Sequence, residues 1–157
     1  MRTYETRSRL FERTTGPDGR YRVRLPAGAN RNAVVSIPVP GTYASVCSRV
    51  RLRTRAGVRL RATRRIAPGG TVRFTGRVLD RPFLRQSKLV ELQAFDAGRW
   101  RTFAQPRAAS PSGRFRSSYR LRRTSAPRTF RFRARVRVEP GWDYLLGASP
   151  VARVRVG

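Results

Sequence analysis

The most regular chemical feature of this sequence is a row of arginines in which every second residue is charged. Residues 129–138 read TFRFRARVRV, with apolar side chains between the charged ones. Guanidinium groups bind phosphates and carboxylates through paired hydrogen bonds. One face of such a row could therefore bind a polyanion. The candidate contact residues are Arg131, Arg133, Arg135 and Arg137.

The same alternation is also the pattern of an ordinary β-strand with one solvated face. Successive side chains of a strand point to opposite sides, so the arginines would face solvent and the residues between them a core. The predicted core-facing residues are Phe130, Phe132, Ala134, Val136 and Val138. Like charges on such a face repel one another, and salt and nearby carboxylates relieve the repulsion. The row therefore predicts a strand and leaves open whether its charged face binds a partner.

Positive charge dominates the whole chain. The sequence holds 36 basic and 8 acidic residues, for a formal net charge of +28 at pH 7. Such an excess attracts polyanions in general. All of the basic residues except Lys88 are arginines, a bias that a need for positive charge does not explain and that GC-rich arginine codons would also produce. Net charge alone is therefore weak support for a dedicated nucleic-acid function.

Residue types that most enzymes require are missing or isolated. The absence of histidine removes the usual general base and the commonest metal ligand. The single cysteine, Cys47, is interpreted as a small apolar filler in or beside a strand. No two acidic residues form a recognisable catalytic pair, and the eight are Glu5, Glu12, Asp18, Asp80, Glu91, Asp96, Glu139 and Asp143. We expect no enzymatic activity, no cofactor, no metal and no small-molecule substrate.

Aromatic residues give one further candidate contact. The sequence Gly-Trp-Asp-Tyr at residues 141–144 falls in an expected loop, where Trp142 and Tyr144 could stack on sugar rings or bases. The alternative is that these rings close the end of the core or pack on an adjoining module. Trp100, which has an arginine on each side, is interpreted as a core residue.

The strands that would position these residues are visible as stretches of alternating apolar and polar residues. Turn residues such as Pro-Gly-Gly and Ser-Pro-Ser-Gly separate the stretches. Many short strands with this spacing predict an antiparallel β-sandwich. The predicted strands are residues 58–62, 71–79, 88–95, 99–104, 114–121, 129–138 and 151–156.

An internal repeat divides the chain into two unequal parts. Residues 13–25 resemble residues 107–119, and residues 49–52 resemble residues 153–156. The Pro-Gly at 40–41 likewise corresponds to the Pro-Gly at 140–141. We therefore predict a complete module at residues 58–157, preceded at residues 1–57 by a partial module that matches only the C-terminal half. The partial module should be weakly stable alone, and the short junction at Ala56 and Gly57 favours an end-to-end arrangement.

Two segments carry a resemblance to known modules. PDGRYRVRLPAG at residues 17–28 resembles the turn and strand of carboxypeptidase-regulatory-like (transthyretin-like) and bacterial Ig-like modules. The stretch from GGTVRFTGRVLD to ASPVARVRV is similar to tandem Ig-like repeats of exported proteins from high-GC bacteria. The resemblance implies an Ig-like sandwich that serves as a non-catalytic spacer or interaction module of an extracellular or cell-envelope protein. Its partners would be adjacent Ig-like modules of a longer chain.

A second function, of another class, stays open at this point. The arginine-rich sheet faces could bind a polyanion, either nucleic acid or an acidic cell-wall polymer, without reading sequence. No apolar stretch approaches the roughly 18 residues of a membrane span, and we expect none. The N-terminal stretch MRTYETRSRLFERTT also lacks the apolar segment of an export signal. If the protein is exported, we expect its signal to lie outside this sequence.

Overall fold

The computed structural model describes residues 10–26, 28–79, 87–122 and 126–157, and in these segments the chain is all β. The strands form three sheets, and every pairing except the parallel contact of β4 with β11 is antiparallel. The prediction of an all-β, mostly antiparallel fold is confirmed. Within the described segments, no helix is long and apolar enough to cross a membrane.

The sheets differ in size and in their place along the chain. The first is a hairpin of two strands, β1 (Arg31–Pro38) and β2 (Ser45–Leu52). The second has three strands in the order β3 (Val58–Ala62), β5 (Thr71–Val78) and β9 (Arg114–Arg120). The third runs β4 (Arg65–Ile66), β11 (Ala152–Val156), β10 (Arg128–Val136), β6 (Lys88–Asp96) and β7 (Arg99–Ala104), and β8 (Arg107–Ala108) also pairs with β6.

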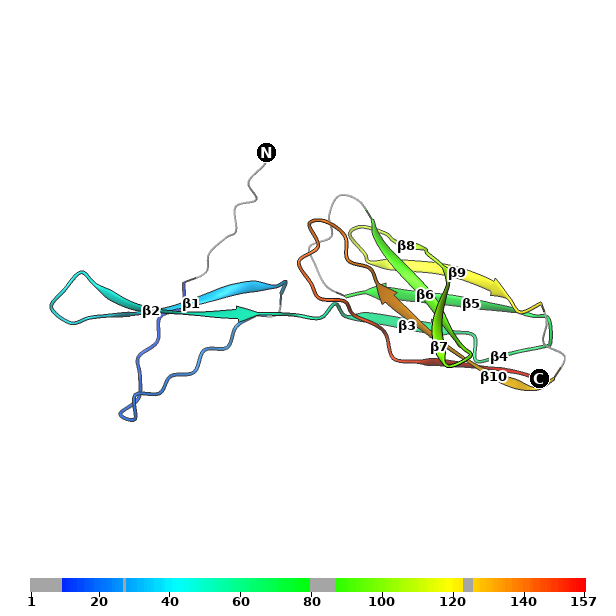
Figure 1. Ribbon diagram of the computed structural model, residues 1–157, viewed down its shortest axis with the longest axis horizontal. Coiled ribbons are helices and arrows are strands. Elements are labelled where there is room, and N and C mark those ends of the chain that lie inside the picture. Colours follow the sequence, from blue (N-terminus) through cyan, green and yellow to red (C-terminus); the bar gives the residue numbers. More distant parts are fainter. Residues whose placement is uncertain (1–9, 27, 80–86, 123–125) are drawn as a thin grey trace.

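The three-stranded and six-stranded sheets pack face to face in a β-sandwich-like arrangement (Figure 1). Phe74 of β5 meets Phe132 of β10 edge to face, with 5.0 Å between ring centroids. Both rings are buried, as are Leu92 of β6 and Val154 of β11. Strand side chains alternate in direction. The apolar residues at every second position therefore enter this core, and the residues between them face solvent.

Each of the seven predicted strands coincides with an observed strand to within two residues at either end. The two-residue strands β4 and β8 were not predicted, because two residues are too few to show an alternation of apolar and polar side chains. The assignment of Val138 to the core is wrong. Strand β10 ends at Val136, and Val138 beyond it is 59% exposed.

The β1–β2 hairpin extends from one end of the sandwich along the long axis of the molecule (Figure 1). Its apolar side chains are uncovered: Val46 is 64% and Val50 is 50% exposed. Cys47 lies in β2 with its thiol exposed. Cys47 thus lies in a strand, as predicted, but it fills no core, because a two-stranded sheet has no second layer to cover it.

Backbone hydrogen bonds join the base of the hairpin to the loop that follows β10. Before β1, the Asn30 amide donates to the Asp143 carbonyl at 2.6 Å, and the Asn30 side chain accepts from the Thr54 amide at 2.7 Å. After β2, the Leu145 amide donates to the Thr54 carbonyl at 2.8 Å, and the Ala56 amide donates to the Leu145 carbonyl at 3.0 Å. Both ends of the hairpin are thus tied to one loop of the sandwich.

Candidate functional site

The arginine row of residues 131–137 lies where its alternation predicts. Arg131, Arg133 and Arg135 project from β10 on the outer face of the six-stranded sheet, since the residues between them enter the core. Arg137 lies beyond the end of the strand and is exposed. The structure therefore brings three of the four candidate residues together, beside the outward residues of β6.

Two of these arginines lie over aromatic rings. The guanidinium carbon of Arg131 is 3.9 Å from the ring centroid of Phe95, and that of Arg133 is 4.2 Å from the ring centroid of Trp100. The two rings meet edge to face at 5.3 Å. Trp100 is only half-buried and lies outside the core, so its assignment to the core is wrong. In the pairing of β7 with β6, Trp100 lies opposite Phe95, whose side chain points away from the core.

A polar network completes this surface. The side-chain oxygen of Gln93, Oε1, accepts from Arg133 Nε at 2.8 Å. Its side-chain nitrogen, Nε2, donates to the Thr102 hydroxyl at 3.2 Å and to the Glu91 carboxylate at 3.3 Å. Arg135 pairs with Glu91 in the strand register. Burial, and then the charge of Arg135, lower the pKa of Arg133 below its usual range. We call this outer surface the arginine–aromatic face; it comprises Glu91, Gln93, Phe95, Trp100, Thr102, Arg131, Arg133 and Arg135.

The two aromatic residues of the 141–144 loop are buried rather than presented to solvent. Trp142 is 6% and Tyr144 is 5% exposed, and their ring centroids are 5.0 Å apart. Lys88, the one lysine of the sequence, places its Nζ 4.7 Å from the centroid of the Trp142 ring. These rings close the end of the core and leave little surface for a ligand.

The Lys88 ammonium is held by a carboxylate at the same place. Its Nζ lies 2.7 Å from Glu139 Oε2, which also accepts from the Leu89 amide at 3.2 Å. Burial raises the pKa of Glu139, but the hydrogen bonds from Lys88 and Leu89 and the charges of Lys88 and Arg107 outweigh it. The net effect is a pKa below the usual range. The pair ties the loop after β10 to the start of β6.

A second arginine surface covers the outer face of the three-stranded sheet. In the strand register, Arg59 lies opposite Arg77, and Arg77 lies opposite Arg114. None of the three strands contains an acidic residue. All of the outward arginines are exposed, and no ion pair among the described residues includes one of them. We call this surface the open arginine face; its arginines are Arg59, Arg61, Arg73, Arg77, Arg114, Arg116 and Arg120.

Sequence reasoning did not single out the open arginine face. Each of its strands alternates, but none carries more than three outward arginines, and the row at residues 131–137 carries four. What gathers the seven arginines is the pairing of β5 with both β3 and β9, strands that are separated by more than fifty residues of sequence. The alternation of arginines within residues 58–62, 71–79 and 114–121 was the available signal.

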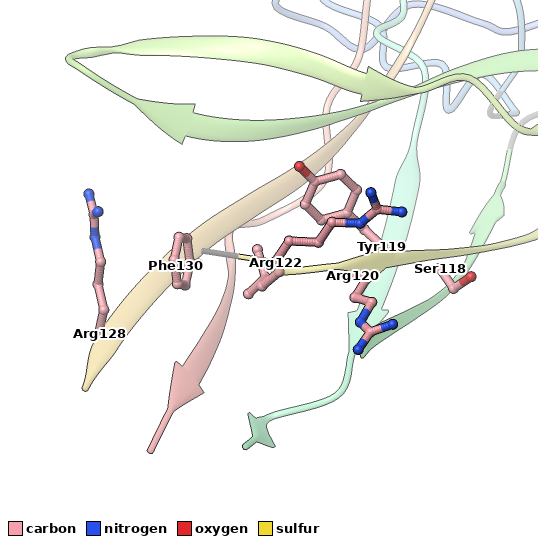
Figure 2. A pocket seen from close by; sticks show the side chains of 7 residues that line it. Ser118, Tyr119, Arg120, Arg122, Arg128 and Phe130 are labelled. Carbon is pink, nitrogen blue, oxygen red and sulfur yellow. The ribbon is translucent and has the colours of Figure 1, made fainter. Parts of the chain in front are cut away.

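An open hollow lies where β9 ends and β10 begins (Figure 2). It has a volume of about 650 Å³. Arg128 and Phe130 line one side, and Ser118, Tyr119 and Arg120 line the other (Figure 2). Leu121 and Arg122 complete the lining. Its polar groups are guanidinium groups and hydroxyls with no carboxylate, so it continues the positive character of the open arginine face.

The acidic residues stay scattered in the described part of the chain. Asp18 pairs with Arg20 at 3.8 Å and Asp96 pairs with Arg101 at 3.4 Å, both on the surface. Within residues 10–26, 28–79, 87–122 and 126–157, no three acidic or cysteine side chains gather as they would around a metal ion. Glu5 and Asp80 lie outside the described residues.

Comparison with family models and with curated proteins finds no match to this chain. The functional interpretation therefore rests on the geometry of the two sheet faces and of the hairpin.

Proposed function

We propose that this chain is a non-catalytic spacer and interaction segment of an extracellular or cell-envelope protein, built from Ig-like modules arranged end to end. The complete module would be residues 58–157 and the partial one residues 1–57. The partners would be neighbouring Ig-like modules of a longer protein. One observation supports this proposal more than any other: the hairpin repeats the pairing of the last two strands of the sandwich.

The equivalence follows from the repeat and the strand registers together. The repeat equates Val50 of β2 with Val154 of β11. Val50 pairs with Ala33, and Val154 pairs with Phe130, so β1 takes the place of β10. Yet Val154 is fully buried and Val50 is half exposed. The hairpin thus has the residue pattern of two paired sandwich strands without the opposing sheet that covers them in the complete module.

The joint between hairpin and sandwich supports a spacer role. A Cβ on Gly147 would lie 1.7 Å from the carbonyl oxygen of Ala56, so only glycine fits where the hairpin meets the sandwich. The hydrogen bonds of Asn30 and Thr54 close the same joint. A joint made of short backbone contacts holds neighbouring modules in line, whereas a flexible linker would not.

Small-angle X-ray scattering of the full chain tests the proposal. A spacer should give a single extended particle, with the hairpin in line with the sandwich. The variant Gly147→Ala should broaden the distance distribution, because its Cβ forces Ala56 away. The matched control Ala148→Ser, at an exposed neighbouring position, should leave the distribution unchanged. A wild-type chain whose hairpin folds back or samples all directions would contradict the spacer function.

A further inference from the structure

The open arginine face has more positive charge than its own fold can neutralise. Arg59, Arg77 and Arg114 form a continuous row across β3, β5 and β9. Like charges directly opposite one another in a sheet are destabilising. Arg77 donates to the Ser112 carbonyl at 2.9 Å, and Arg120 donates to the Gly69 carbonyl at 3.1 Å, but a carbonyl does not cancel a charge. An external anion would relieve the repulsion.

We propose that the open arginine face binds double-stranded nucleic acid through its phosphate backbone, without reading base sequence. This goes beyond a spacer function, and it assigns a partner to a surface that the fold leaves uncovered. The charge of the face is complementary to a duplex, and release of condensed counter-ions from the phosphates drives such binding.

The residue types on this face are suited to phosphate oxygens and poorly suited to ligands that bind by stacking. Arginine offers paired donors that match phosphate oxygens. Between the arginines stand hydroxyl side chains, which are common phosphate contacts, namely Thr71, Thr75 and Ser118. No outward position of β3, β5 or β9 is aromatic. Single-stranded nucleic acids and many sugars are bound by stacking on aromatic rings, so this face is poorly suited to them.

The layout of the charges favours a duplex over a single extended polymer. The arginines spread over three adjacent strands, and a row across them spans two strand spacings, roughly 10 Å. That width is close to the major groove of DNA, about 12 Å, so flexible arginine side chains can reach phosphates on both sides of a groove. One linear chain would contact a single line of charges and leave the others unpaired.

Titration of a fluorescent DNA duplex of mixed sequence with the full chain, followed by anisotropy, tests the proposal. Measurements at about 0.05 to 0.2 M salt give the salt slope. The triple variant Arg59→Gln, Arg77→Gln and Arg114→Gln should weaken binding at about 0.15 M salt by at least about tenfold. If each arginine contacts one phosphate, the slope of log affinity against log salt should become shallower by about 2.7.

A matched variant separates this face from net charge. Arg137→Gln, Arg153→Gln and Arg155→Gln removes the same charge from exposed positions elsewhere on the sandwich and should cost far less affinity. Unfolding curves of both variants verify that each is folded. Equal losses in the two variants would overturn the proposal, as would tighter binding of single-stranded DNA or heparin than of duplex. Loss of all duplex binding by about 0.15 M salt would also overturn it.

Discussion

On the six-stranded sheet, Arg131 and Arg133 lie over aromatic rings, and Arg133 also bonds to Gln93. On the three-stranded sheet, Arg59, Arg77 and Arg114 lie opposite one another with no ring or carboxylate between them. Both surfaces arise from the same alternation of arginine and apolar residues. Arg131 also lies opposite another arginine, Arg153. The difference is that rings, the Gln93 side chain and the Glu91 carboxylate stand beside the arginines of the first surface, and the second has no such neighbours.

The difference between the two sheet faces shows that the charge of an arginine row does not by itself make a binding site. A guanidinium group that stacks on a ring and bonds to an amide is already partly desolvated and held in place. It gains less from a new anion than a solvated guanidinium group with like charges beside it. The longest row in the sequence is therefore the poorer candidate, and the surface assembled from three shorter rows is the better one.

Lys88 is the extreme case of a partnered cation, and its loss should have the largest effect. Lys88→Met removes the ammonium and leaves the carboxylate of Glu139 without its ion-pair partner, which should lower the free energy of unfolding by about 3 kcal/mol. Urea denaturation followed by tryptophan fluorescence measures the change. The control Arg153→Gln, at an exposed position with the same charge change, should have little effect. Equal losses would mean that charge, rather than the buried contact, is responsible.

The same ion pair gives a pH dependence. The pKa of Glu139 is lowered in the folded state, and its unfolded value is about 4.3. Its contribution to stability is therefore fully present above about pH 4.3 and is lost as the pH falls through the folded pKa. In urea titrations at a series of acidic pH values, Glu139→Gln should reduce the dependence of stability on pH. Parallel profiles for wild type and variant would contradict the assignment.

Breaking the arginine–aromatic face is expected to have the next largest effect. Trp100→Ala removes a half-buried ring that packs on Phe95 and Arg133, which should cost about 2 kcal/mol of stability. Trp100→Phe keeps an aromatic surface under the guanidinium group and should restore most of the loss. If alanine and phenylalanine were equally destabilising, the ring stacking would not be what holds Arg133.

The same substitution on each face should give the smallest effects, of opposite sign. Arg133→Gln loses its hydrogen bond to Gln93 and its ring contact, for a cost of about 1 kcal/mol. Arg114→Gln removes a like charge opposite Arg77, for a gain of about 0.3 kcal/mol. The gain should vanish near 1 M salt, where the screening length is about 3 Å. Urea denaturation in low and in high salt measures the change in the free energy of unfolding for each variant. Changes of the same sign in the two variants would contradict the distinction between the faces.

Much of the fold was predictable because strand alternation is a local property. The cores of β5 and β10 follow from residues two apart, such as Val72 with Phe74 and Phe132 with Ala134. Trp100 was misplaced because its flanking arginines do not reveal which side of β7 meets the core. The pairing of β6 with β7 also shifts register between Leu92 and Gln93, so the residues that lie opposite one another cannot be found by counting along the two strands.

The sequence by itself determined that the chain forms amphipathic strands and that the arginines of those strands face outward. Only the tertiary structure decided which arginines have partners, because strand pairing joins residues that are far apart in sequence. It set Arg133 beside Gln93 and Trp100, and it set Arg77 between two other arginines. Charge is a property of the residue, whereas its availability to a ligand depends on the side chains that pairing places around it.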